Sequence, residues 1–366
     1  MANIVQEPKK LTPQERAHLF AQSTRQHFLM LPAVAGAENS TVSINIPKAR
    51  LGAKVRLLIT GIINAQHATE VTYVPGNGSP YNFIRSLSLD TNFGFKLFDL
   101  SGRGTYFYNL LRNNGNTVIP FTPALAADAA ISRSKAVQGL QSAVAPGTDN
   151  TFRMVVDLPI TLNDREPAGI ILLQNEETQV TVNINFGTVN DLCPASAGYT
   201  FAVSNIVVTP MVETFSIPAF KEGFPDISIL KLVHEQNQNV AGAGIETVKL
   251  PTGTIYRKLI FYVTDAAGAG VPDGTFTGDF EMNFNQADTP YRISPRILSA
   301  INQEHYGTEL PQGLFALDFT YQGMPNYGGT RDYIDSEKLS EMWLRISMAA
   351  AGRITIVSEQ LARLRG

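Results

Sequence analysis

The chain is built from short segments in which apolar residues alternate, and one amphipathic helix interrupts this pattern in each half. The first helical segment covers residues 105–113, and the second covers residues 294–306. Both follow a strand-rich stretch and lead through Asn, Gly and Pro turns into another apolar strand, at 117–121 and 313–320. A β-unit that occurs twice in one chain is more typical of a building block than of a catalyst.

Length and composition favour two ordered β domains. At 366 residues the chain exceeds the size at which one hydrophobic core stops growing. Its hydrophobic content of 44% is ample for packed cores, and its 29 glycines and 21 prolines suit a turn-rich, all-β chain. Charged residues make up 17%, below the usual level of about a quarter. Either the exposed surface is small, or much of it is hidden in an assembly.

Alternation with a period of two predicts the strands. The clearest examples are residues 41–46 (TVSINI), 53–64 and 179–187. The other predicted strands lie at 71–73, 83–89, 93–99, 152–162, 168–174, 202–215, 227–236, 255–264, 280–284, 314–320, 342–347 and 353–358. Residues 122–150 are rich in Ala, Ser and Gly and are predicted to form a surface excursion. Two sets of short strands separated by turns indicate two sandwiches or barrels.

An amphipathic helix is predicted over residues 13–31, ahead of the β region. Thr12 can cap its start, Pro13 suits the first helical position, and Glu15 completes a capping box. Apolar residues recur at three- and four-residue steps until Pro32 ends the pattern. Such an arm must dock on a neighbouring chain, on a membrane surface or on its own domain.

These patterns predict a chain of four parts. Residues 1–40 form an N-terminal arm that contains the helix at 13–31, and residues 41–216 form the first β domain. Residues 217–226 read as a linker, and residues 227–366 form the second β domain.

No catalytic, cofactor-binding or metal-binding residue is predicted. No two histidines lie within five residues of each other, so the H-x-H and H-E-x-x-H pairs of metal sites are missing. The histidines are His18, His27, His67, His234 and His305. The G-x-S-x-G elbow of many hydrolases is also missing. We therefore expect a protein without enzymatic activity, cofactor or metal.

Two features could be interpreted as sites or as ordinary structure. Cys193 is the single cysteine, and packing in a reducing cytosol is its expected role. The glycine-rich run at 266–274 lacks the G-x-G-x-x-G spacing and opens a strand, so we expect a hairpin loop. Asp265, Asp273 and Asp279 around it could bind a cation such as calcium, although turns also use Asp and Gly.

Two acidic groups could be interpreted as the paired carboxylates of a glycosidase. They are Glu166, Glu176 and Glu177, and Asp332, Asp335, Glu337 and Glu341. A carbohydrate-cleaving sandwich also lines its groove with tryptophan, and Trp343 is the single tryptophan. We expect these carboxylates to be solvated loop charges.

The charge pattern argues against nucleic-acid binding. The net charge is -3, from 29 basic and 32 acidic residues, and no block of five or six like charges occurs. The first residues, MANIVQEPKK, lack the apolar core of a secretion signal, and no run of 18 apolar residues occurs. Synthesis in the cytoplasm is therefore expected.

Several segments, taken in order, resemble one protein family. Residues 11–25 begin LTPQERAHL, residues 63–71 read INAQHATEV, and residues 157–186 run from DLPITLNDREPAG to an alternating strand. Residues 83–90, 106–114 and 294–321 follow the same order of strands and helices. This series is similar to a double jelly-roll major capsid protein, above all to those of tectivirus-type, membrane-containing bacteriophages. The 122–150 excursion has no counterpart in that family.

The resemblance implies a viral shell protein. It implies two eight-stranded jelly-roll barrels in tandem, each flanked by one short helix, with the N-terminal helix at the base. Three chains would form a pseudo-hexagonal homotrimer, and trimers would tile an icosahedral shell over an internal lipid membrane. The implied partners are neighbouring trimers, penton and minor capsid proteins, and the membrane through the N-terminal helix, with no direct nucleic-acid contact.

Two other functions stay open at this point. A glycan-binding spike or receptor-binding sandwich would expose an aromatic platform. A sandwich-fold hydrolase or metal enzyme would hold a stoichiometric metal ion or a paired set of catalytic groups.

Overall fold

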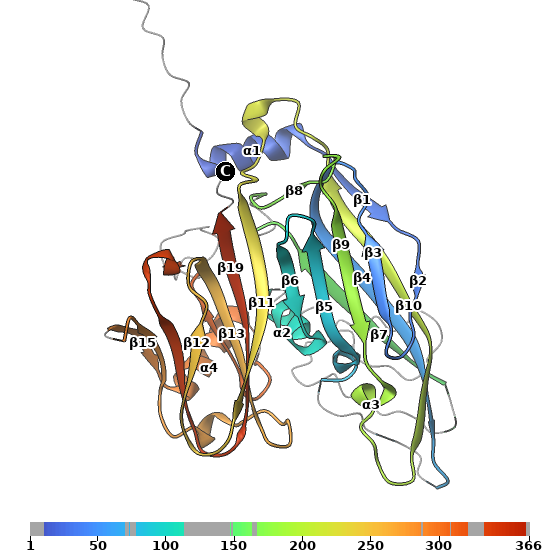
Figure 1. Cartoon of the computed structure of the whole chain (residues 1–366), viewed down its shortest axis with the longest axis vertical. Helices are drawn as coiled ribbons and strands as arrows, with labels where there is room; N and C mark the ends of the chain where they lie inside the picture. Colours follow the sequence, from blue (N-terminus) through green and yellow to red (C-terminus); the bar gives the residue numbers. More distant parts are fainter. Residues whose placement is uncertain are drawn as a thin grey trace, which may run out of the picture.

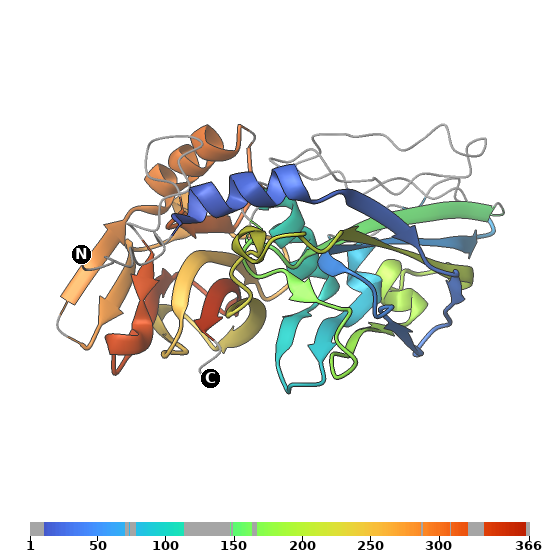
Figure 2. The ribbon, with the colours of Figure 1, turned by 90° about the horizontal axis from the view of Figure 1, so that it is seen from above.

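The computed structural model describes residues 11–69, 73, 78–112, 147, 149–162, 167–286, 288–307, 309–320 and 333–363. Two β halves stand side by side, with helix α2 between them (Figure 1). Seen from above, helix α1 extends across the boundary between the halves (Figure 2). The predicted strand at 117–121, most of the one at 71–73 and most of the 122–150 excursion lie outside the described residues.

The first half contains ten strands and four helical elements in the described residues. Its strands are β1 (Gln26–Met30), β2 (Val34–Ala35), β3 (Thr41–Asn45), β4 (Leu51–Gln66), β5 (Ile84–Thr91), β6 (Lys96–Leu100), β7 (Asp149–Pro159), β8 (Ile171–Leu172), β9 (Val180–Phe186) and β10 (Thr200–Phe215). Its helices are α1 (Pro13–Ser23), η1 (Tyr81–Phe83), α2 (Gly102–Arg112) and α3 (Val189–Leu192).

The second half repeats this arrangement after the 3-10 turn η2 (Lys221–Gly223). Its strands are β11 (Ile229–Val240), β12 (Gly244–Leu250), β13 (Ile255–Asp265), β14 (Phe280–Phe284), β15 (Asp288–Ile293), β16 (Leu314–Asp318), β17 (Ile334–Asp335), β18 (Met342–Met348) and β19 (Gly352–Arg363). Its helices are η3 (Asp273–Thr275), α4 (Pro295–Tyr306) and η4 (Ser336–Lys338).

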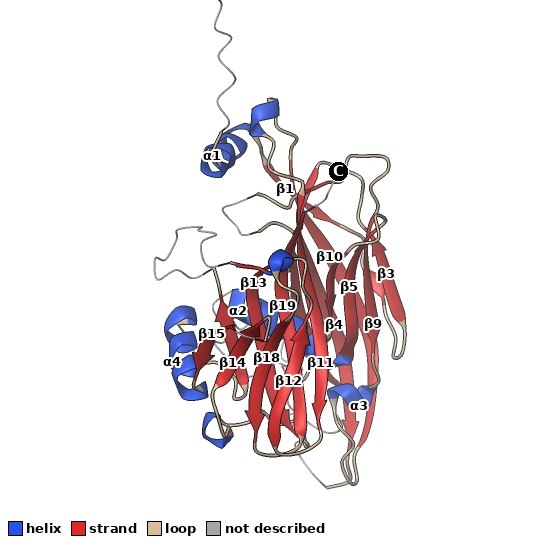
Figure 3. Ribbon diagram, turned by 60° about the vertical axis from the view of Figure 1, so that its left-hand side comes forward, coloured by secondary structure: helices blue, strands red, loops and turns tan. Residues whose placement is uncertain are grey.

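Three sheets build the two halves, and one of them belongs to both. One sheet has the order β1-β10-β4-β7, and another has the order β12-β18-β14-β15. The nine-stranded sheet between them runs β16-β13-β19-β11-β6-β5-β9-β3, and its ninth strand, β17, pairs with β13 off this path. Each half therefore places four strands of the shared sheet against a sheet of its own, which gives eight strands per half on these paths (Figure 3).

Alternating residues explain why the sheets close around two cores. In β9 the side chains of Val180, Val182, Ile184 and Phe186 are buried, whereas those between them face outward. Aromatic rings meet in both cores: Phe83, Phe152 and Phe186 in the first, and Phe261, Phe280 and Phe315 in the second. The strand period predicted from the sequence therefore places the apolar face of β9 correctly.

The predicted helix at 294–306 is confirmed almost to the residue. Helix α4 begins at Pro295, and the hydroxyl of Ser294 accepts a hydrogen bond from the Ile297 backbone N–H at its N-cap. The helix predicted at 105–113 is α2, which begins earlier, at Gly102. A carbon at Cβ of Gly102 would lie 1.9 Å from the Tyr81 carbonyl oxygen, so the close approach of η1 requires glycine here.

The helix predicted over residues 13–31 is wrong in its second part. The capping box of Thr12 and Glu15 starts α1 as predicted, but the helix ends at Ser23. The hydroxyl groups of Ser23 and Thr24 donate to carbonyl oxygens one turn earlier, and Thr24 has extended dihedral angles. Residues 26–30 form β1, which pairs along its whole length with β10. This tertiary pairing outweighs a helical apolar pattern that continues in the sequence.

Other strand boundaries also differ from the prediction. The predicted strand at 168–174 shrinks to β8, and the start of the predicted strand at 93–99 is the turn before β6. The edge strands β12 and β15 were not predicted: β15 is mostly polar and exposed, and β12 buries only Val248 and Leu250. The division into four parts stays a prediction, since β1 and β2 of the predicted arm add to the first sheet.

Candidate functional site: the junction between the two barrels

The two halves are joined through the backbone. Strand β11 of the second half lies parallel to β6 of the first, with Val233 opposite Phe98 and His234 opposite Asp99. This short seam is what makes the middle sheet continuous across the molecule. The orientation of one half relative to the other is therefore set by main-chain pairing as well as by side-chain packing.

A carboxylate from the second half holds the start of α2 in the first. Glu235 accepts hydrogen bonds from the backbone N–H and the hydroxyl of Ser101, at 2.8 and 2.7 Å. The Ser101 hydroxyl in turn accepts the Gly104 N–H at 3.0 Å. A carboxylate at a helix N-terminus is stabilised by the unpaired N–H groups and by the helix dipole. A Cβ at Gly104 would lie 2.2 Å from the Glu235 carboxylate, so the glycine leaves room for this contact.

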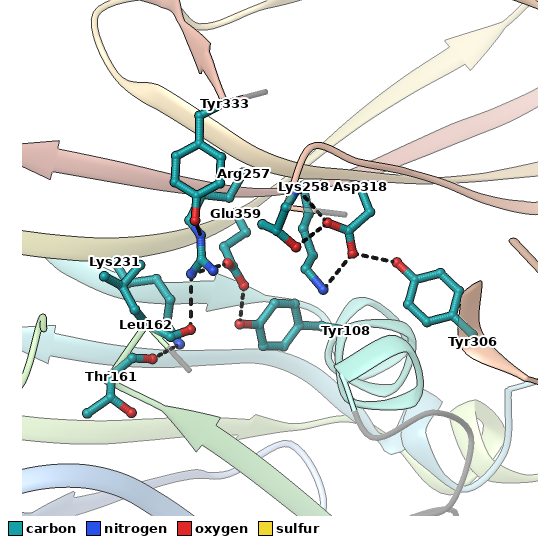
Figure 4. Close-up of polar contacts among 11 residues, drawn as sticks. Tyr108, Thr161, Leu162, Lys231, Arg257, Lys258, Tyr306, Asp318, Tyr333 and Glu359 are labelled. Carbon is teal, nitrogen blue, oxygen red and sulfur yellow. Dashed lines mark hydrogen bonds and ion pairs between the residues drawn. The ribbon is translucent and has the colours of Figure 1, made fainter. Parts of the chain in front are cut away.

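A buried ion pair continues the junction from α2 into the second core. Arg257 of β13 and Glu359 of β19 lie 2.8 Å apart, and each side chain is only 5% exposed. Tyr108 of α2 donates its hydroxyl hydrogen to the other Glu359 oxygen at 2.6 Å (Figure 4). One carboxylate therefore binds groups from both halves of the chain.

Two cations of the second half also reach carbonyl oxygens of the first. Arg257 donates to the Leu162 carbonyl at 3.0 Å, and Lys231 donates to the Thr161 carbonyl at 2.5 Å (Figure 4). We refer to Tyr108, Lys231, Arg257 and Glu359 as the junction cluster. Its members come from α2, β11, β13 and β19, and each residue is at most 4% exposed.

The junction cluster keeps its carboxylate charged. Burial raises the pKa of Glu359, but Arg257, Lys231, Lys258 and the hydrogen bond from Tyr108 together bring the pKa below its ordinary value. Burial and the neighbouring Glu359 charge raise the pKa of Tyr108 well above its ordinary value, so the phenol stays a donor. Buried charges of this kind are tolerated only when they are paired and hydrogen-bonded.

A second ion pair lies beside the cluster. Lys258 of β13 and Asp318 of β16 are 2.8 Å apart, and Tyr306 of α4 donates to the same carboxylate at 3.0 Å (Figure 4). Burial raises the pKa of Asp318, but Lys258 and Thr320 outweigh burial, so the net shift of this pKa is downward. This pair fixes α4 against its own half.

The N-terminal arm docks on its own barrel, which decides one question that the sequence left open. Phe20 of α1 is 4% exposed, and its ring packs edge-to-face on Phe215 with centroids 5.2 Å apart. The small cluster around Phe20 is completed by Leu51, Ala53 and Ile170. The outward residues of α1 are polar or small: His18, Ala21 and Gln22. The apolar stripe of the helix is therefore occupied within the chain.

Replacing Phe20 with alanine should release the arm while the barrels stay folded. The lost packing corresponds to about 3–5 kcal/mol for a buried phenylalanine, but the loss is limited to the docking energy of a peripheral segment. Hydrogen exchange should become faster in α1 and stay unchanged in β13. The exposed Gln22→Ala on the same helix is the matched control, and unchanged exchange in α1 of Phe20→Ala would contradict this docking.

Among the described residues, the acidic side chains that the sequence suggested as cation or glycosidase sites do not come together in one site. In the described part of the chain, no group of three His, Cys, Asp or Glu side chains could hold a metal ion. Asp265 accepts the backbone N–H groups of Ala267 and Ala269, and Asp279 pairs with Arg292 at 2.9 Å. Glu176, Glu177, Asp335 and Glu337 are exposed, as expected for solvated charges, and Glu341 is half-buried. Glu166 and Asp332 lie outside the described residues.

Cys193 behaves as a packing residue. Its side chain is buried in the first core, and burial raises the pKa of its thiol to about 12. The thiol therefore stays protonated and is a poor nucleophile. Trp343 lies half-buried on β18, opposite Lys249 and Asn283 of the neighbouring strands.

Sequence reasoning did not identify the junction cluster. The signal that could have found it is a charged residue inside an apolar strand, as at Arg257 in IYRKLIFYVT and at Glu359 in TIVSEQL. A charge at such a position needs a buried partner. The sequence cannot show that the partners are each other, because they lie on strands that are far apart along the chain.

Comparison with solved structures identifies the fold of the chain. No family model and no curated protein sequence matches the chain. Among solved structures, the STIV major capsid protein aligns with a TM-score of 0.69 over 93% of this chain and 97% of that one, at 17% identity. The chain has the double jelly-roll fold.

Two further double jelly rolls are similar over the full length. The major capsid protein P2 from Bacteriophage PM2 has a TM-score of 0.56 and 11% identity, covering 93% of this chain and 98% of that one. The PBCV-1 virus capsid has a TM-score of 0.61 and 8% identity, covering 92% and 93%. The predicted fold class, two eight-stranded jelly rolls in tandem, is therefore confirmed, and so is the likeness to capsid proteins.

Proposed function

We propose that this chain is a viral major capsid protein, a structural subunit without enzymatic activity. The observation that carries the proposal is the full-length match of both jelly rolls, in one order, to capsid subunits of three viruses. Both halves are matched in one alignment, which covers 93% of this chain and 97% of the STIV protein. A fold can host unrelated functions, so the assignment needs support from the site.

The junction supports a structural role. A shell subunit with two barrels needs them at a constant angle, because an error in that angle would be repeated in every copy. The parallel seam of β6 and β11, the Glu235 cap on α2 and the Tyr108–Glu359 hydrogen bond all connect the halves. The junction joins the barrels tightly and gives the chain the rigidity that a tile requires.

The subunit is proposed to act as a homotrimer within a virion. Three copies with two barrels each would give six similar units around a threefold axis, which suits a pseudo-hexagonal tile of an icosahedral shell. Its partners would be neighbouring trimers and penton and minor capsid proteins. The low charged fraction of 17% suits a subunit whose sides are covered by neighbours.

A membrane beneath the shell would meet the α1 region through charge and polar contacts. Among the described residues, none of the helices has the length and apolar character that a bilayer span requires. Because Phe20 is buried in the barrel and His18, Gln22 and Arg25 are exposed, this region favours adsorption to anionic headgroups over insertion. Such adsorption is weak for one helix and adds up over many copies.

The trimer is tested by light scattering of the purified chain. We expect a mass of three times the 39.9 kDa chain, unchanged by dilution through the micromolar range, because shell tiles are obligate assemblies. A monomeric mass at micromolar concentration would contradict the proposed tile. Retention on a glycan array together with a monomeric mass would favour the spike alternative instead.

A further inference from the structure

Strand β1 is an open edge of the first barrel. It ends the sheet β1-β10-β4-β7, and in the described residues no strand pairs with its other side. Figure 1 shows it at the periphery, away from the second half. A strand edge of this kind exposes unpaired N–H and C=O groups that a further strand can bind.

The pairing with β10 identifies which groups face the edge. The Leu31 N–H donates to the Pro210 carbonyl, and the Ser216 N–H donates to the Arg25 carbonyl. Odd-numbered residues of this strand therefore bond toward β10, because the direction alternates along an antiparallel ladder. The N–H and C=O groups of the even-numbered residues point to the open edge; these residues are Gln26, Phe28 and Met30.

The same three residues carry an exposed apolar face. Phe28 and Met30 are 61% and 60% exposed, and Gln26 beside them is exposed as well. Side chains at alternate positions share one face of a strand. Hydrogen-bonding groups and two large apolar side chains are therefore presented together.

Two other described edge strands, β12 and β15, carry the devices that prevent pairing. Strand β15 contains Asp288, Pro290 and Arg292, and β12 contains Glu246 and Lys249. Charges and proline at an edge oppose the addition of another strand. In β1 there is no Asp, Glu, Lys, Arg or Pro, and its ladder with β10 has no bulge. The edge strand β3 also lacks these residues, but its exposed side chains are polar, whereas β1 exposes Phe28 and Met30. The β1 edge is left open to a partner.

We propose that β1 pairs with β1 of a second copy of this chain, antiparallel about a twofold axis at Phe28. The pattern is self-complementary: Phe28 would face Phe28 of the second copy, and Gln26 would face its Met30. All three positions point to the edge, so each opposed pair could exchange two main-chain hydrogen bonds. The two phenylalanine rings would meet as a cross-strand pair.

The small area of the β1–β1 contact indicates that it would form within an assembled shell. A five-residue strand pair buries much less than the roughly 1,200 Å² of a stable complex, so one pair would be weak in dilute solution. In a shell, where many copies are held side by side, weak contacts add by avidity. The inference rests on the proposed function for this setting and assigns β1 to the contact between adjacent tiles.

The substitution Phe28→Cys tests the register directly. Opposed hydrogen-bonded residues have Cα atoms about 5.5 Å apart, which lies within disulfide range. Oxidation of the concentrated full-length Phe28→Cys protein should therefore give a disulfide-linked dimer on non-reducing gels. The native Cys193 is buried and contributes no background.

Met30→Cys is the matched control, because Met30 is as exposed as Phe28. In the proposed register the two copies of position 30 lie about 13 Å apart along the strand, so this variant should give about tenfold less dimer or none. A mixture of Gln26→Cys and Met30→Cys chains should restore the cross-link. Equal dimer from the Phe28→Cys and Met30→Cys variants, or none from either, would overturn the pairing.

The test separates this inference from the proposed function. Trimers by light scattering without a cross-link in Phe28→Cys would leave the capsid assignment standing and refute the β1 contact. A cross-link in Phe28→Cys in a chain that never forms trimers would support the β1 contact and refute the tile.

Discussion

Replacing Glu359 with glutamine should destabilise the chain by about 3–5 kcal/mol, the cost of breaking a buried ion pair from one side. The glutamine keeps the shape but removes the charge that balances Arg257, whose side chain is 5% exposed. Arg257 would then be a buried cation without its carboxylate. Denaturant unfolding measures the loss as a lower midpoint at unchanged slope.

An exposed carboxylate supplies the control. Asp279 pairs with Arg292 at 2.9 Å, but the two side chains are 36% and 66% exposed, so solvent screens the pair. Asp279→Asn should change the midpoint far less than Glu359→Gln. Equal changes in the two variants would contradict a special role of the junction cluster.

The pH dependence of the unfolding midpoint shows whether the loss of stability in Glu359→Gln comes from the missing charge. The folded-state pKa of Glu359 lies below its unfolded value, which is about 4.3 for a glutamate. The contribution of Glu359 to stability is therefore complete above the unfolded value and is lost as the pH falls through the folded-state pKa. The difference between wild type and Glu359→Gln should shrink over this acidic range, because the carboxyl group becomes neutral like the amide. A difference that stays constant with pH would point to altered packing instead.

Replacing Phe261 with alanine should cost about 3–5 kcal/mol as well, the usual cost of such a core truncation. Its ring is fully buried in the second barrel and lies 5.1 and 5.4 Å from the rings of Phe280 and Phe315. The variant leaves a cavity between β13, β14 and β16. Because the nine-stranded sheet passes through both barrels, we expect a single unfolding transition at a lower midpoint.

The transition can be followed with two probes. Near-ultraviolet circular dichroism reports on the aromatic cores, and hydrogen exchange in β4 reports on the first barrel. Coincident loss of both signals is expected. Separate transitions, with the first barrel surviving after the second unfolds, would contradict a rigid junction. The exposed Phe95 is the control, since Phe95→Ala leaves no cavity.

The strands could be predicted because their physics is local. A strand with one buried face must alternate, and residues 179–187 show that alternation in the order in which β9 buries them. The start of α4 could be predicted for a similar reason, since Ser294 and Pro295 together define a helix N-terminus. These elements can be recognised from residues that are neighbours in the sequence.

β1 and the junction cluster could not be predicted, because both depend on partners that are remote in sequence. Residues 26–30 continue a helical apolar pattern, and only the ladder with β10, which places Phe28 opposite Glu213, makes them a strand. Tyr108 and Glu359 are 251 residues apart. The topology brings them together, and no local pattern encodes that topology.

We propose that three copies of this chain form a tile of a viral shell. Cryo-electron microscopy of the purified full-length chain tests it most directly. We predict particles or sheets built from pseudo-hexagonal units, each with six barrels around a threefold axis and the α1 ends on one side. Isolated monomers, or oligomers without threefold symmetry, would contradict it.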